Sequence, residues 1–232
     1  MEVVIVCIGD ELLAGDIADL NSTWLAKNLT DGGAIVQRII VIPDDMGVIV
    51  EEIKKVYGSY DKVVVTGGLG PTHDDITRYA VARAFDRKIV RDPKGVEVVE
   101  KAIEARGRKP RPESYAMADI PEGSEVIVNP VGAAPGFIVN GKVFVFPGVP
   151  AEMKAMFELV KGRFAGKKLI VDWLIVHMPE SAIVKDLNEA VQKFPAVTFG
   201  SYPSTIVKIK MKSYDEGQVK AAKEWLAQRL GV

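Results

Sequence analysis

The sequence is poor in cysteine. Cys7 is the only one among 232 residues, so a disulfide bond within the chain is excluded. It lies inside the apolar run of residues 3–8, where a thiol is typically buried and is not a nucleophile. A chain without disulfide bonds suits a reducing compartment, and we expect the protein to be cytoplasmic.

Histidine is almost as scarce, with His73 and His177 as its two positions. Two distant histidines and one cysteine cannot form a Cys/His metal cluster. They also give no Ser/His/Asp arrangement that can be assembled with any support. We therefore do not expect nucleophilic catalysis by a side chain of this protein.

The chain also lacks a strong net charge and long apolar runs. A formal net charge of -1 gives no basic field for non-specific nucleic-acid binding. No apolar run approaches the roughly 20 residues needed to span a bilayer, and the N-terminus has no basic targeting segment. We expect a small-molecule partner, with neither nucleic acid nor a membrane as a partner.

Short apolar runs alternate with segments of helical periodicity, which is typical of βαβ units around a mostly parallel sheet. The pattern predicts an α/β fold with strands at residues 3–8, 36–42, 62–66 and 143–146. It predicts helices at residues 21–33, where Asn21, Ser22 and Thr23 are good caps, at 46–57 and 94–105, and directly after Asp75.

The pattern changes near Gly166. The following 65 or so residues predict a strand at 169–176, a helix at 180–193, strands at 196–201 and 205–211, and a helix at 216–230. This is a small α+β domain. We predict one domain over residues 1–166 and a second over 167–232.

The most informative segment runs from Val63 to Asp75, with the sequence VVVTGGLGPTHDD. A strand buried on both faces leads into glycines that allow backbone N–H groups to surround an anion. Two carboxylates, Asp74 and Asp75, follow, and a divalent cation would reconcile them with a phosphate because hard cations bind carboxylates and phosphate oxygens together. A plain turn in which Asp74 or Asp75 caps the next helix remains the alternative.

Acidic pairs follow two other predicted strands. Asp10 and Glu11 come after the first strand, and Asp44 and Asp45 come after the second. The carboxyl ends of parallel strands form the edge where open α/β sheets bind ligands. These acids therefore become candidate ligands or water-orienting bases, although each pair alone could be an ordinary turn.

A second glycine- and proline-rich region completes the candidate site. It comprises NPVGAAPG from Asn129 and FPGVPAEM from Phe146, separated by a strand. A proline at the first helical position after a glycine turn leaves free N–H groups for an anion. The basic segment GRKPRP at residues 107–112 is interpreted as a solvated connector in preference to a phosphate contact.

Together, IGDELLAGDIADLNSTWLAKNL, VIPDD, TGGLGPTHDDIT, NPVGAAPGF and FPGVPAEM resemble the competence-damage-inducible, CinA-like proteins. The N-terminal domain of that family belongs to the molybdopterin-binding, MoaB/Mog-like superfamily, and the similarity covers residues 3–164. Leu69 stands where the molybdenum branch commonly has Thr or Ser, and with Pro71 and Thr72 it favours the CinA-like branch.

The resemblance implies a three-layer α/β/α domain, usually oligomeric, that binds a nucleotide or pterin phosphate in the TGG loop. It associates Asp75 with metal and catalysis, and Asp44 with the site of relatives that activate molybdopterin. CinA-like proteins also have an ADP-ribose pyrophosphatase activity supported by divalent ions. Many add a nicotinamide mononucleotide amidase domain, for which this chain ends too soon, and the segment after Gly166 resembles the small linker-type domain of the family.

The first hypothesis is therefore a metal-dependent hydrolase that cleaves ADP-ribose into AMP and ribose 5-phosphate, acting as a homodimer or homotrimer with Mg²⁺ or another divalent cation such as Co²⁺. Its catalytic residues are Asp75, Asp44 and Asp10, and its metal ligands are Asp74, Asp75 and Glu11. Substrate contacts are assigned to Thr66, Gly67, Gly68, Gly70, Pro71, Thr72, Gly132, Pro147, Gly148 and Pro150. The alternatives are molybdopterin binding or adenylyl transfer in molybdenum cofactor synthesis, and a nucleotide-binding module without catalysis.

Overall fold

The computed structural model describes residues 1–204 and 206–232. It divides the chain into two compact units, Met1–Gly166 and Lys167–Val232. None of the helices in the described residues is long and apolar enough to cross a membrane.

A six-stranded sheet forms the centre of the first unit, in the order β2-β1-β3-β8-β7-β6. The pairs β1/β2, β1/β3 and β3/β8 are parallel, and β7 is antiparallel to both β8 and β6. The mostly parallel α/β sheet predicted from the sequence is therefore present. Its strands are β1 (Glu2–Ile8), β2 (Ile35–Ile42), β3 (Lys62–Thr66), β6 (Glu125–Ile127), β7 (Gly136–Val139) and β8 (Val143–Phe146).

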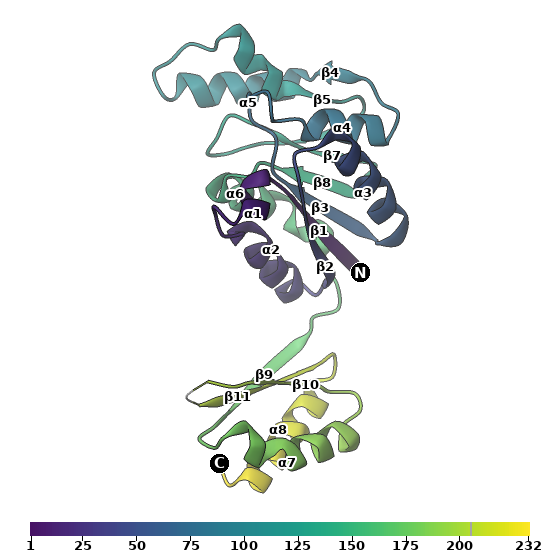
Figure 1. Ribbon diagram of the computed structural model, residues 1–232, viewed down its shortest axis with the longest axis vertical. Helices are drawn as coiled ribbons and strands as arrows, with labels where there is room; N and C mark the ends of the chain where they lie inside the picture. Colours follow the sequence, from purple (N-terminus) through teal and green to yellow (C-terminus); the bar gives the residue numbers. More distant parts are fainter. Residues whose placement is uncertain (205) are drawn as a thin grey trace. The chain divides into compact units, whose positions relative to one another are not determined.

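Helices cover both faces of this sheet and give three α/β/α layers. One face packs against Leu25 and Leu29 of α2 and Phe157 of α6, and the other against Ile49 and Ile53 of α3. Figure 1 shows α2 and α6 on one side of the sheet and α3 and α4 on the other. The helices are α1 (Asp10–Ala14), α2 (Leu20–Asp31), α3 (Met46–Ser59), α4 (Thr77–Ala84), α5 (Pro93–Glu104) and α6 (Pro150–Val160).

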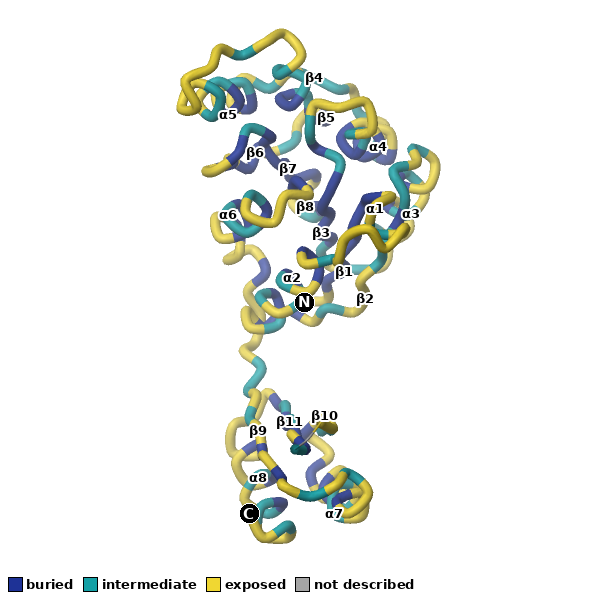
Figure 2. Tube along the Cα trace, turned by 60° about the vertical axis from the view of Figure 1, so that its left-hand side comes forward, coloured by how far each residue is buried: buried dark blue, intermediate teal, exposed yellow. Residues whose placement is uncertain are grey.

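Apolar β-branched residues fill the middle of the sheet, which is fully buried. In β1 and β3, Val3 to Val6 and Val63 to Val65 are 0% exposed, as expected for strands covered on both faces. Figure 2 shows these strands as dark, buried segments. A sheet fixed in this way holds the ends of its strands, and the loops that leave them, in place.

Several elements differ from the sequence prediction. Helix α2 is capped by Asp19, whose side chain accepts from the N–H of Ser22, so the cap expected at residues 21–23 lies too late. The prediction also omitted α1, β6 and β7, two 3-10 segments (Pro112–Ala118 and Lys161–Phe164), and the antiparallel pair of β4 (Ile89–Arg91) and β5 (Asp119–Pro121). These pieces are short, and short segments show little periodicity.

The second unit is an antiparallel sheet, in the order β10-β11-β9, with two helices on one face. The small α+β arrangement matches the expectation from the sequence, with bounds shifted by one to two residues; Thr205, the predicted start of one strand, lies outside the described residues. The elements are β9 (Ile170–Val176), α7 (Glu180–Lys193), β10 (Thr198–Tyr202), β11 (Val207–Ser213) and α8 (Glu216–Leu230).

Candidate functional site

The carboxyl ends of β1, β2, β3 and β8 meet at one edge of the large sheet. The register pairs Ile8 with Ile42, Cys7 with Thr66, and Thr66 with Phe146. The loops leaving these ends enclose a pocket of about 640 Å³, a size typical of small-molecule sites. Ten residues predicted from the sequence line it: Glu11, Asp44, Gly67, Gly68, Gly70, Pro71, Asp74, Asp75, Pro147 and Gly148.

Five predicted residues do not line this pocket. Thr66 and Pro150 line an adjoining pocket of about 410 Å³. Asp10, Thr72 and Gly132 line neither pocket, and their backbone N–H groups donate to Asp44, Asp75 and Asn129 respectively.

The TGG loop needs glycine at its first two glycine positions. Gly67 has φ +113° and Gly68 φ +64°, a region that side chains disfavour. A Cβ on Gly67 would also overlap the carbonyl oxygen of Ile8, and one on Gly68 the hydroxyl of Thr77. Both residues line the pocket, so the backbone itself forms this part of its wall.

Only some of the loop's N–H groups remain available to a ligand. Gly67 donates to the carbonyl of Phe146 at 3.1 Å, and Gly70 donates to Asp75 at 2.6 Å. The N–H groups of Gly68 and Leu69 make no hydrogen bond within the described residues. Of the three N–H groups assigned to phosphate from the sequence, those of Gly67 and Gly70 are therefore already used within the protein, whereas that of Gly68 is free, as is that of Leu69.

Asp75 organises the loop that contains it. One carboxylate oxygen accepts from the N–H of Gly70, and the other accepts from the N–H of Thr72, at 2.9 Å, and from its hydroxyl. Helix α4 has no side-chain cap, so the alternative in which Asp75 caps the next helix is wrong. Because both oxygens already accept loop hydrogen bonds, this geometry favours a positioning role over direct cation binding.

Arg78 supports the same loop from inside the protein, and the sequence analysis missed it. Its side chain is 2% exposed, and its guanidinium donates to the carbonyls of Leu69, Gly70 and Ala116. These bonds fix the Leu69–Gly70 and Gly70–Pro71 peptide groups of the loop against α4. Burial lowers the pKa of Arg78, and Asp75 is among the groups that oppose this shift.

A group of carboxylates lies on the β1/β2 side of the pocket. Asp10 and Asp44 are linked reciprocally, since the N–H of Asp10 donates to Asp44 at 3.1 Å and the N–H of Asp44 donates to Asp10 at 3.3 Å. Burial raises the pKa of Asp44, and the negative charges of Asp10, Glu11 and Asp74 raise it further. The acids after three different strands, predicted separately from the sequence, therefore act on one another.

A hydrogen-bond network joins the TGG loop to the second loop. Asn21 donates to the hydroxyl of Thr66 at 3.1 Å and to the carbonyl of Gly148 at 2.7 Å. Thr66 in turn donates to the carbonyl of Pro147 at 3.0 Å. Thr66 is 2% exposed, and its hydroxyl connects the two loops through these bonds. It therefore does not line the main pocket.

The loop that follows β8 carries the other wall. Pro150 is the first residue of α6, whose cap residue Val149 makes no side-chain capping bond, so N–H groups of the first turn stay free. Gly132 is fixed by Asn129, which also donates to Glu152 at 2.7 Å. Glu152 lines the main pocket and was not singled out from the sequence, although it ends the FPGVPAEM motif.

Two arginines complete the pocket. Arg106 and Arg108 line it beside Ser114. Arg108 belongs to the GRKPRP segment and is exposed, as expected for a solvated connector, and it also lines the pocket. The one signal was its basic charge, which is ambiguous in an exposed loop.

Two further candidate residues, His73 and Cys7, do not line this pocket. His73 is exposed near Asp74 and does not line the pocket. Burial, reinforced by Asp19, raises the pKa of the Cys7 thiol, so it stays protonated and unreactive.

Comparisons with known proteins agree with this architecture. Residues 4–165 match the family described as "Probable molybdopterin binding domain", and residues 168–232 match the one described as "FAD synthase, middle domain". A protein of Archaeoglobus fulgidus is 43% identical over 225 residues, which are 96% of this chain and 95% of that protein.

Two relatives carry more specific names. A CinA-like protein of Desulfosudis oleivorans is 32% identical over 98% of this chain, which spans 59% of that protein. The crystal structure of CinA from Thermoplasma acidophilum, described as a protein of unknown function, superposes with a TM-score of 0.66 and 32% identity. The match covers 72% of this chain and all of that one. The chain belongs to the CinA-like proteins of the molybdopterin-binding-domain family.

Proposed function

We propose that the site hydrolyses the diphosphate linkage of ADP-ribose or a close nucleoside diphosphate, with a divalent cation as cofactor. The observation that carries the proposal is the pair of free N–H groups at Gly68 and Leu69, placed in one pocket with carboxylates and two arginines. N–H groups of this kind bind phosphate oxygens. A pocket of about 640 Å³ has room for a ligand of this class.

A divalent cation fits the donor set on the acidic side. Glu11 and Asp74 line the pocket and offer hard oxygen ligands; the described residues contain no group of three His, Cys, Asp or Glu side chains placed to bind a metal, so substrate phosphate oxygens would supply the remaining ligands. This suits Mg²⁺, which is often held by one or two carboxylates together with substrate phosphates. A bound cation would supply positive charge between these carboxylates and the diphosphate.

The reaction transfers a phosphoryl group to water. Water attacks one phosphorus atom, the bridging P–O bond breaks, and the products are AMP and ribose 5-phosphate. Asp44 accepts the proton of the attacking water, because its raised pKa makes it a stronger base than an ordinary carboxylate. Gly68 and Leu69 donate to the phosphate oxygens as negative charge develops on them, and Arg106 and Arg108 help to neutralise the diphosphate.

A panel of nucleoside diphosphate compounds with several divalent metals, scored by released AMP, tests the proposal. We expect AMP from ADP-ribose with Mg²⁺ or Co²⁺, none with a chelator, and a loss of at least about a hundredfold in kcat for Asp44→Asn. Loss of a general base costs about 10²–10⁴ in rate. Metal-independent release, or native turnover by Asp44→Asn, would disprove the mechanism.

The family match favours a second candidate, molybdopterin binding with adenylyl transfer. The matched family is described as a molybdopterin-binding domain, and the same N–H groups and arginines suit a pterin phosphate. Tight molybdopterin binding with ATP-dependent adenylylation, and no turnover of ADP-ribose, would select this function. Saturable AMP binding without any product would instead identify a non-catalytic binding module.

A further inference from the structure

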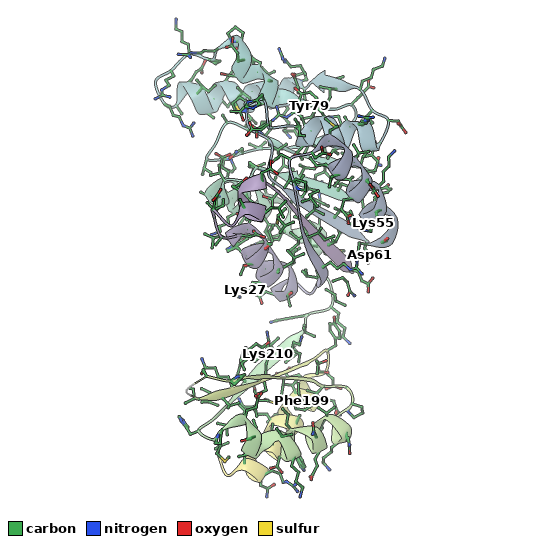
Figure 3. The ribbon with its side chains drawn as sticks, in the orientation of Figure 1. Lys27, Lys55, Asp61, Tyr79, Phe199 and Lys210 are labelled. Atoms are coloured by element: carbon green, nitrogen blue, oxygen red, sulfur yellow. The ribbon has the colours of Figure 1, made fainter. Side chains whose placement is uncertain are left out.

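The open face of the small sheet is a separate surface that the pocket chemistry does not use. Helices α7 and α8 cover one face of β9, β10 and β11. In Figure 3, Phe199 lies on the helix side of the sheet and Lys210 on the opposite side. The register places nine residues on Lys210's face: Val171, Trp173, Ile175, Thr198, Gly200, Tyr202, Lys208, Lys210 and Lys212.

Two aromatic side chains stand exposed on this open face. Trp173 is 40% exposed and Tyr202 50% exposed, and their ring centroids are 5.3 Å apart. Gly200 leaves space for Tyr202, since a Cβ there would approach its ring at 3.3 Å. Single exposed apolar residues are common, but adjacent ones form a patch of the kind that often marks a binding site.

A row of lysines runs alongside the aromatic residues. Lys208, Lys210 and Lys212 alternate along β11, and the Lys210 ammonium lies 5.2 Å from the Trp173 ring centroid. Alternate residues of a strand are about 6.7 Å apart, about twice the 3.4 Å rise of a stacked nucleic-acid strand. The row therefore suits the phosphates of an extended, unstacked strand.

The charge of this unit agrees with an anionic partner. Residues 167–232 contain ten Lys and Arg against seven Asp and Glu, a formal net charge of +3, whereas residues 1–166 carry -4. The whole-chain value of -1 hides this division. None of the nine residues on the open face is acidic.

From these observations we propose that the open face binds single-stranded nucleic acid, with bases stacked on Trp173 and Tyr202 and phosphates paired with the lysine row. Sheet faces with exposed aromatics and cations bind single strands in this manner. A second copy of the chain is a poorer occupant. A two-fold interface across this face would bury several lysines without an acidic partner on the same surface, which is costly.

The test uses the full chain and fluorescein-labelled oligothymidylate and oligouridylate of about a dozen nucleotides, followed by fluorescence anisotropy. We expect saturable binding that weakens as salt rises, a weaker affinity for duplex DNA, and no competition by ADP-ribose. Trp173→Ala is expected to weaken binding about tenfold, as loss of a stacking platform does.

A matched pair of charge reversals keeps the result interpretable if Trp173→Ala disturbs folding. Lys210→Glu alters the open face and should weaken binding about tenfold, whereas Lys220→Glu makes the same change on exposed α8 and should have a much smaller effect. Equal effects of the two reversals, tighter binding of duplex, or no saturable binding at low salt would overturn the proposal. Loss of self-association in Trp173→Ala without any oligonucleotide binding would assign the face to a second copy instead.

Discussion

The carboxylate of Asp75 accepts a hydrogen bond of 2.6 Å from the backbone N–H of Gly70, five residues earlier in the same loop. With the bonds from Thr72 to its other oxygen, this contact closes the TGG loop on itself. The conformation that leaves the N–H groups of Gly68 and Leu69 free thus depends on a carboxylate that need not touch the ligand.

Asp75→Asn tests this positioning role. An amide presents an NH₂ group to one of the two sets of donors, so hydrogen bonds to a charged group, worth about 1.5–3 kcal/mol each, are lost. We expect AMP binding, measured by titration calorimetry, to weaken at least about tenfold. The Mg²⁺ concentration that gives half-maximal release of AMP from ADP-ribose should stay unchanged. Glu11→Gln, which removes a proposed metal ligand lining the pocket, is the comparison and should raise the Mg²⁺ requirement; if Asp75→Asn raises it equally, Asp75 is a metal ligand.

Gly68→Ala should damage the loop through the backbone. Its φ of +64° disfavours a side chain by about 1–2 kcal/mol, and the new Cβ would overlap the Thr77 hydroxyl. We expect lower stability in urea unfolding and weaker AMP binding. Gly58→Ala in α3 is the matched control, because a Cβ there meets nothing within 4 Å and alanine favours a helix; equal losses in both variants would contradict the argument.

Arg78→Met should destabilise the protein by disrupting the TGG loop. Removing the guanidinium leaves the carbonyls of Leu69, Gly70 and Ala116 without their buried donor, at about 1–3 kcal/mol for each unsatisfied group. We expect a fall of at least about 3 kcal/mol in the free energy of unfolding. The same change at Arg83, exposed on the same helix, should cost less than about 0.5 kcal/mol, and comparable losses would remove Arg78 from its assigned role.

Sequence reasoning located the elements with long, regular patterns. The runs at Val3 and Val63 are buried strands, and the acids that follow β1, β2 and β3 converge because parallel strands end at one edge. The residues that hold the loops were harder to find. Arg78 looks like any helical arginine until burial and three carbonyl acceptors are known, and the role of Asn21 depends on partners 45 and 127 residues away.

The sequence shows which groups the TGG loop contains, but not which of them stay free for a ligand. A glycine-rich motif predicts free N–H groups without saying which of them the loop itself consumes, and here Gly70 donates to Asp75. The place of Arg108 in the pocket was not predicted for a related reason: the sequence of an exposed basic loop does not reveal which surface the loop approaches.

A last prediction concerns pH and the small unit. Lys223 donates to both carboxylate oxygens of Asp172, at 2.9 and 3.0 Å, and this contact lowers the pKa of Asp172. A carboxyl whose folded pKa is depressed adds stability above its unfolded pKa of about 3.9 and loses it as pH falls through the folded value. Both side chains are more than a third exposed, so the contribution is limited to about 0.2–1 kcal/mol.

Asp172→Asn should therefore destabilise the unit at neutral pH, and its effect should shrink as pH falls below the unfolded pKa and vanish below the lowered folded pKa of Asp172. Urea unfolding can be followed in a Trp24→Phe background, where the remaining tryptophans, Trp173 and Trp225, both report on residues 167–232. Glu224→Gln, an exposed change beside Lys223, serves as the control and should show no such pH dependence. A loss from Asp172→Asn that is as large at pH 3 as at pH 7 would mean that the side chain stabilises the unit without its charge, through packing or neutral hydrogen bonds alone.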